Sequence, residues 1–182
     1  MSGWTAAIVT TLVALNPLGV ARAVAWFDRS DADSRRLVIG TLAAMGAALM
    51  GLGLLAAPVL SLLDVSTQTF RLAAAVVIGI SGAKTLLAPT GPITEIDDRR
   101  DGALTLATLT LTPAAVFAAM AANSDGGTAA GLVAVAIAVA ATLAAVAARP
   151  VPEPALGALV RFTGAAAILV AVATGLDSAR SV

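Results

Sequence analysis

Two pairs of a polar residue followed by proline interrupt long apolar stretches of this sequence. They are Asn16-Pro17 in LVALNPLGVAR and Thr112-Pro113 in LTLTPAA. A proline inside a helix has no N–H to donate, and its ring crowds the carbonyl four residues earlier. In lipid an unpaired carbonyl costs several kcal/mol, so such a break persists only when it is buried in protein or lines a wet cavity. We therefore expect both breaks to supply backbone groups to a polar site inside the membrane.

The side chains beside the breaks offer hydrogen bonds rather than titratable groups. Asn16 carries two donors and an acceptor oxygen, and Gly19 lets another backbone or a solute approach closely. Thr105, Thr108 and Thr112 have the spacing of one polar stripe on a helix. The alternative is that the hydroxyls bond to their own helix and that the prolines only kink it. The residues that we predict for a substrate site are Asn16, Pro17, Gly19, Thr108, Thr112 and Pro113.

The chain lacks the residues that catalytic sites most often use. It has no histidine, cysteine or tyrosine, and no Asp or Glu lies deep in an apolar stretch. Hydrolysis inside a membrane needs a base, an acid pair or a metal site, and a proton relay needs buried carboxylates. We therefore expect no enzyme, no metal site and no bound cofactor. Sodium is a candidate coupling ion, because freed carbonyls and the oxygens of Asn and Thr can bind a hard cation.

The composition predicts a membrane protein. Of the 182 residues, 59% are hydrophobic and 12% are charged, against about 25% charged in soluble domains. The formal net charge is zero, so we expect no nucleic-acid partner. Stretches that can cross a bilayer, at about 20 residues each, are 4–27, 37–61, 70–88, 103–122, 129–148 and 157–176. Trp4 and Trp26 bracket the first stretch at a spacing that suits the two membrane interfaces.

Basic residues are distributed unevenly between the two sides of this arrangement. One side holds Arg22, Arg29, Arg35, Arg36, Lys84, Arg99, Arg100, Arg149 and Arg161. The opposite side holds only Arg71 and Arg180. Because basic connections stay in the cytoplasm, we expect a multi-pass protein of the cytoplasmic membrane with both termini on the outer side.

The two halves of the chain correspond at several positions. Residues 15–17 (Leu-Asn-Pro) align with 111–113 (Leu-Thr-Pro), and 70–72 (Phe-Arg-Leu) align with 160–162 (Val-Arg-Phe). Broken segments at corresponding positions indicate a transporter with inverted repeats, although two independent kinks would also give this pattern. We predict an all-α polytopic membrane protein with six transmembrane helices as two inverted three-helix repeats. The single domain, 1–182, would consist of repeat one at 1–88, a linker at 89–102 and repeat two at 103–182.

Small residues at four-residue spacing predict helix-packing faces, because small side chains let membrane helices approach closely. One set lies in the second stretch and the other in the sixth. They are Gly40, Ala44 and Ala48, and Ala167, Ala171 and Gly175.

Several segments carry a resemblance to a known family. They are LNPLG (15–19), SRR (34–36), DVSTQTFRLAAAVVIGISGAKTL (64–86) and RFTGAAAILVAVATGLD (161–177). In these the chain resembles the MarC family of six-helix bacterial membrane proteins, which is related to neutral amino-acid transporters and more distantly to the LysE exporter group. The chain departs from the family where Ala74-Ala75 replace a double glycine and where only Pro113 remains of a proline-rich stretch ending in Gly-Pro-Gly. The resemblance implies movement of small neutral amino acids, such as alanine or glycine, across a bacterial cytoplasmic membrane.

Together these features predict a secondary transporter that moves a small neutral amino acid, or a similar small solute, by alternating access. A non-transporting scaffold or assembly subunit would instead have a closed core between the first and fourth stretches. A passive small-solute channel would have a continuous wet path. The expected partners are a small-molecule substrate and the lipid bilayer, and a homo-oligomer is left open.

Overall fold

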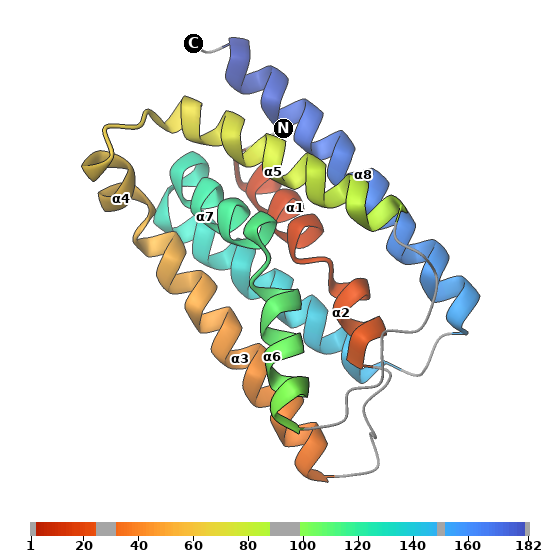
Figure 1. Cartoon of the computed structure of the whole chain (residues 1–182). Coiled ribbons are helices and arrows are strands. Elements are labelled where there is room, and N and C mark those ends of the chain that lie inside the picture. The colour runs from red at the N-terminus through yellow and green to blue at the C-terminus, as the bar shows by residue number, and fades with distance from the viewer. Residues whose placement is uncertain (1–2, 25–31, 88–98, 149–151, 181–182) are drawn as a thin grey trace.

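The computed structural model describes residues 3–24, 32–87, 99–148 and 152–180, and the regular elements in these ranges are all α-helices (Figure 1). They are α1 (Gly3–Leu15), α2 (Pro17–Val24), α3 (Ala32–Leu54), α4 (Ala56–Leu62), α5 (Thr67–Leu87), α6 (Arg99–Thr110), α7 (Pro113–Ala147) and α8 (Glu153–Arg180). Gly127, at φ 77° and ψ 169°, divides α7 into two arms. The first arm is Pro113–Asn123 and the second is Gly127–Ala147. Figure 1 shows the second arm turning back beside the first.

Five helical stretches in the described part of the chain are long and apolar enough to cross a membrane. They are Gly3–Val24, Asp33–Leu54, Thr67–Leu87, Gly127–Ala147 and Pro154–Arg180. They match five of the six predicted stretches. The predicted fourth stretch, 103–122, is divided between α6 and the first arm of α7, and neither part is long enough to span alone.

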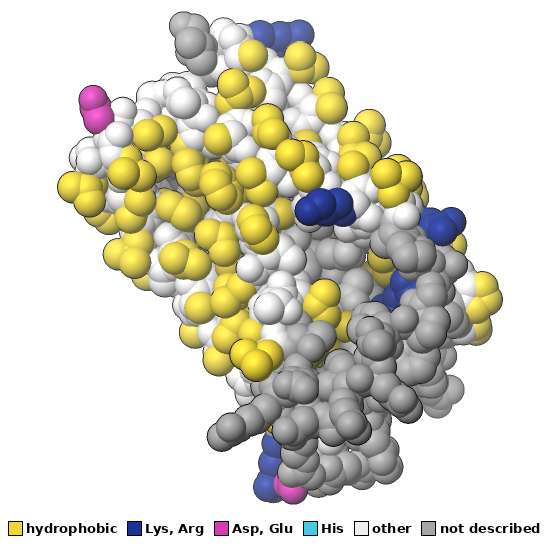
Figure 2. Space-filling model, viewed as in Figure 1, with side chains coloured by type: hydrophobic (Ala, Val, Ile, Leu, Met, Phe, Trp, Pro, Cys, Tyr) yellow, Lys and Arg dark blue, Asp and Glu magenta, His cyan; other side chains and the backbone are white. Residues whose placement is uncertain are grey.

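The outer surface is suited to lipid. Leu62, Phe162 and Leu169 are 85%, 72% and 72% exposed, which would be unusual on a soluble monomer, where large apolar patches are rare. Figure 2 shows hydrophobic side chains spread over much of the described surface on this face, with few charged side chains among them. Such a surface is consistent with a multi-pass membrane protein. Trp26, the second predicted interface residue, lies outside the described residues.

The helix α1 packs antiparallel to the first arm of α7 through alanines. Ala7 shares a core cluster with Ala122, while Ala14 shares one with Ala114 and Ala118. Residues late in the first arm therefore lie beside the start of α1, and residues early in that arm lie beside its end. Alanine is small enough for the two backbones to come close.

The helices α5 and α8 form a second antiparallel pair with a closer approach. A Cβ built on Gly82 would lie 2.8 Å from the Gly164 carbonyl oxygen and 2.8 Å from the Ala167 Cβ. Farther along the pair, a Cβ on Gly79 would lie 3.4 Å from the Ala171 Cβ. These contacts confirm the packing face predicted in the sixth stretch, since its small residues receive the small residues of α5.

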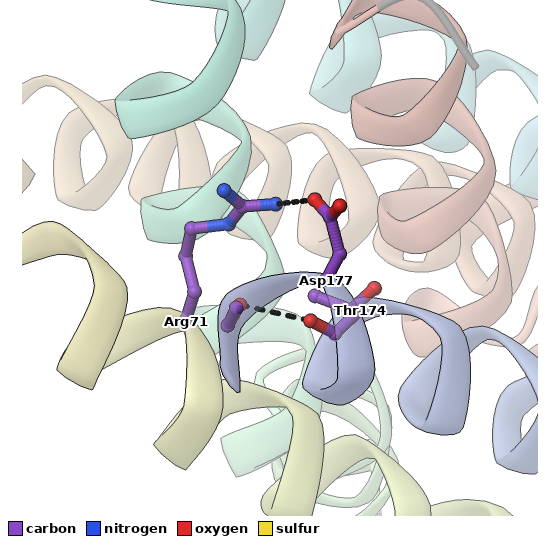
Figure 3. A network of polar contacts seen from close by, with 4 residues as sticks. Arg71, Thr174 and Asp177 are labelled. Atoms are coloured by element: carbon purple, nitrogen blue, oxygen red, sulfur yellow. Dashed lines mark hydrogen bonds and ion pairs between the residues drawn. The ribbon is translucent and has the colours of Figure 1, made fainter. Parts of the chain in front are cut away.

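An ion pair joins the start of α5 to the end of α8. Arg71 Nη2 donates to Asp177 Oδ2 at 3.3 Å, and Figure 3 shows the two groups pointing toward each other from neighbouring helices. Near it, Ser178 Oγ donates to the Thr174 carbonyl at 2.8 Å. The Asp177 side chain is 74% exposed, and exposed pairs contribute only about 0–1 kcal/mol. The pair therefore marks the antiparallel register rather than supplying much stability.

The packing face predicted in the second stretch is wrong for Gly40 and Ala44, which are exposed. The buried face of α3 instead passes through Val38, Leu42 and Leu49, which recur at helical spacing. Large side chains fill that side of α3, so the stripe of small residues turns outward. Ala48 is partly buried.

Candidate functional site

The break between α1 and α2 is formed by Asn16 itself. Its backbone has φ 50°, in the left-handed region that Asn tolerates better than most residues. Asn16 Oδ1 accepts from the Gly19 N–H at 3.1 Å, and the Asn16 carbonyl accepts from the Val20 N–H at 3.1 Å. Asn16 is thus the N-cap of α2 with Pro17 at the first helical position, where a missing N–H is harmless. The interruption predicted at Pro17 is confirmed.

Thr112 lies at the break between α6 and α7 and also caps the helix that follows, although its backbone conformation differs from that of Asn16. It has an extended backbone, at φ −62° and ψ 150°, and its Oγ1 accepts from the Ala115 N–H at 3.2 Å. The Thr112 carbonyl accepts from the Val116 N–H at 3.1 Å, and Pro113 follows as the first helical residue. The interruption predicted at Pro113 is confirmed, and both breaks are ordinary helix starts placed in the middle of an apolar stretch.

The two breaks meet at one cavity of about 150 Å³. Its lining comes from both breaks and from α5 and α8: Val13, Ala14, Leu15, Asn16, Gly19, Val20, Ile78, Ser81, Gly82, Thr85, Leu109, Thr112, Ala114, Thr163, Gly164 and Ala167. Pro17 and Pro113 deprive the carbonyls four residues earlier of their usual donors, and those carbonyls belong to the lining residues Val13 and Leu109. Each break therefore places a residue whose carbonyl lacks its usual helical donor in the lining, and such backbone is tolerated in a membrane only within protein or beside water.

Three of the predicted site residues line this cavity: Asn16, Gly19 and Thr112. Pro17 is buried outside the lining, and Pro113 is exposed. Both prolines therefore shape the site through the backbone instead of facing it.

Thr108, the remaining predicted site residue, is exposed and does not line the cavity. The predicted stripe assumed one continuous helix, but α6 ends at Thr110, so the helical spacing does not carry from Thr108 to Thr112. Thr110, which the stripe left out, is buried, and its Oγ1 donates to the Leu106 carbonyl at 2.7 Å. Thr110 therefore bonds to its own helix, as threonines in membrane helices commonly do.

Sequence reasoning missed the hydroxyl residues that α5 and α8 contribute. Ser81 and Thr85 line the cavity from α5, and Thr163 lines it from α8. Thr163 Oγ1 donates to Asn16 Oδ1 at 3.0 Å, across 147 positions of sequence. A signal was present, because Ser-Gly-Ala at 81–83 and Thr-Gly-Ala at 163–165 place a hydroxyl beside each of the glycines that meet.

The cavity lining is mostly apolar, with five polar but uncharged side chains: Asn16, Ser81, Thr85, Thr112 and Thr163. Among the described residues, none that lines it is ionisable, and no cluster of three or more His, Cys, Asp or Glu is suited to a metal. The N-terminal ends of α2 and of α7 carry partial positive charge, and the C-terminal ends of α1 and α6 carry partial negative charge. Fixed dipoles of both signs therefore meet at one small cavity, an arrangement that can hold a small zwitterion or a polar neutral solute.

Gly19→Ala is expected to disrupt the Asn16 cap, because a Cβ at this position would lie 2.6 Å from Asn16 Nδ2 and 2.9 Å from its Cγ. The Asn16 amide would have to leave the Gly19 N–H, and loss of an N-cap costs about 1 kcal/mol. We expect a lower free energy of unfolding in mixed micelles. Gly51→Ala is the control, since a Cβ there would meet nothing within 4 Å. Equal stability of the two variants would contradict this account of the cap.

Comparison of the chain with protein-family models, with curated proteins and with solved structures found no match.

Proposed function

We propose that this chain is a secondary transporter that moves a small neutral amino acid, or a similar small solute, across the cytoplasmic membrane by alternating access. The observation that carries the proposal is the cavity of about 150 Å³ that two broken helices share with α5 and α8. Broken helices whose half-helix ends face a mid-membrane site are typical of secondary transporters.

The proposed architecture has six crossings in two inverted three-helix repeats. In this architecture the broken pair α1 and α2 corresponds to the broken pair formed by α6 and the first arm of α7. The helix α3 corresponds to the second arm of α7, and α5 corresponds to α8. The antiparallel packing of α1 on the first arm, and of α5 on α8, supports this pairing. The matching caps at Asn16 and Thr112 support it independently. Most of the proposed linker, 89–102, lies outside the described residues.

The size of the cavity supports a small solute. At about 30 Å³ per water in the liquid, its 150 Å³ matches a molecule with about five or six non-hydrogen atoms. Glycine and alanine are of this size, and the resemblance to the MarC family implies the same substrates. A zwitterion buried there needs a partner for each of its charges, and the half-helix ends supply partial charges of both signs.

The proposed orientation places both termini outside a bacterial cytoplasmic membrane. It rests on the excess of Lys and Arg on the side of Arg35, Arg36 and Lys84. Access would alternate as one repeat rocks against the other, and sodium is the candidate coupling ion because carbonyl and hydroxyl oxygens are its preferred ligands.

The cavity also bears on the alternatives. A scaffold or assembly subunit was expected to have a closed core between the first and fourth stretches, and the lining residues Asn16 and Thr112 belong to those stretches. This favours a transporter over a scaffold. A passive channel differs from a transporter in its kinetics, because its flux does not saturate at low solute concentration.

Uptake of labelled alanine and glycine into proteoliposomes, with and without an inward sodium gradient, tests the proposal. We expect saturable uptake that exceeds that of protein-free liposomes and that unlabelled alanine inhibits. Flux that rises linearly with concentration would identify a channel instead. If protein shown to be folded gave no uptake and no exchange of either amino acid, that result would refute the proposal.

A further inference from the structure

We infer that Thr163 positions the Asn16 amide so that the cavity binds the carboxylate of its solute, an inference that rests on the proposed function. Thr163 lies on α8, and Asn16 lies at the α1–α2 break. Both residues line the cavity, and a hydrogen bond of 3.0 Å joins them.

The Asn16 side chain has one orientation that satisfies its neighbours. Its Oδ1 accepts from the Gly19 N–H at 3.1 Å and from the Thr163 hydroxyl at 3.0 Å. An amide oxygen has two lone pairs, so these bonds saturate it. A flipped amide would place NH₂ against the Gly19 N–H, with donor facing donor, so the flip is excluded.

This orientation leaves the donors of Asn16 for the solute. Within the described part of the chain, neither hydrogen of Asn16 Nδ2 has an acceptor. Across the cavity, Thr112 Oγ1 accepts from the Ala115 N–H, which leaves its hydroxyl hydrogen as a further donor. Both groups cap the positive ends of half-helices. Beside the negative helix ends at the same breaks, these two groups therefore supply donors and positive dipoles, which suit an anionic acceptor such as a carboxylate.

Thr163 holds Asn16 through a shared hydrogen. Its Oγ1 also lies 2.7 Å from the Val160 carbonyl, so the single hydroxyl hydrogen forms a three-centre bond to its own helix and to Asn16. The valine side chain has nearly the same shape as that of threonine but carries a methyl group in place of the hydroxyl. Thr163→Val would leave the Gly19 N–H as the single donor to Asn16 Oδ1 and would hold the amide less firmly in its orientation, whereas Thr163→Ser would keep both bonds.

The test compares three probes by calorimetric titration of the purified full chain in detergent. Alanine carries both charged groups, propionate lacks the ammonium group, and alaninamide lacks the carboxylate. We expect Thr163→Val to lower the affinities for alanine and for propionate equally, by about tenfold. This is the contribution of about one hydrogen bond to a charged group. The affinity for alaninamide should change less than twofold, and the affinity of Thr163→Ser for alanine should equal that of the wild type.

The matched control is Thr142→Val, which removes a buried hydroxyl that donates to the Ala138 carbonyl at 2.8 Å and does not line the cavity. It should leave all three affinities unchanged. If Thr163→Val lowered the affinities for alanine and alaninamide equally, Thr163 would have a structural role alone, and the inference would be overturned. An unchanged affinity of this variant for alanine would also overturn it. If the wild-type chain binds neither alanine nor glycine, it is the proposed function that fails.

Discussion

Asn16→Gly is expected to lower alanine affinity by ten- to a hundredfold while leaving the chain folded. The change removes both Nδ2 donors, and hydrogen bonds to a charged group contribute about 1.5–3 kcal/mol. The backbone at this position has φ 50°, which glycine adopts without steric cost. Glycine is also accepted at N-caps at a cost of only a few tenths of a kcal/mol. Calorimetric titration with alanine measures the affinity, and unfolding in mixed micelles measures the stability.

Asn16→Ala separates the side chain from the backbone. It removes the same amide but, unlike glycine, it has a Cβ at positive φ, which costs about 1–2 kcal/mol without the local hydrogen bonds of an Asn side chain, and it loses the cap for about 1 kcal/mol more. We therefore expect both variants to lose affinity but only the alanine variant to lose substantial stability. Wild-type affinity in Asn16→Gly would remove Asn16 from the proposed site.

Gly164→Ala is expected to cause the largest loss of stability. A Cβ on Gly164 would lie 2.8 Å from the Gly82 carbonyl oxygen and 2.8 Å from the Leu86 backbone nitrogen. Neither atom can move unless all of α5 moves, so the two helices must separate. Overpacking of this kind costs about 1–3 kcal/mol, and occasionally more. Because Gly82 and Gly164 both line the cavity, the same separation should also weaken alanine binding.

Gly40→Ala is the matched control for this variant. A Cβ on Gly40, in the exposed part of α3, would meet nothing within 4 Å. In a helix interior alanine is favoured over glycine by about 0.8–1 kcal/mol, so Gly40→Ala should leave stability unchanged or raise it. The measurement is the unfolding midpoint of both variants in the same mixed micelles. A loss of stability in Gly164→Ala no greater than in Gly40→Ala would contradict the close α5–α8 contact.

The sequence by itself determined the helical class, most of the membrane stretches and the positions of the two breaks. These properties are local. Hydropathy over about 20 residues fixes a span, and Pro17 cannot donate the helical hydrogen bond of its position whatever packs around it. Asn16 and Thr112 each cap the half-helix that follows through contacts no more than four residues away.

Only the tertiary structure decided which side chains share the cavity. The predicted threonine stripe failed at Thr108 because the break that the sequence indicated also ended the helical spacing on which the stripe depended. The stripe of small residues in α3 turned outward because neighbouring helices pack on Val38 and Leu42. Thr163 reaches Asn16 because α8 packs beside α1 and α2 at the break. Contacts between distant segments depend on how whole helices pack, and the residues around Asn16 and Thr163 do not by themselves specify that contact.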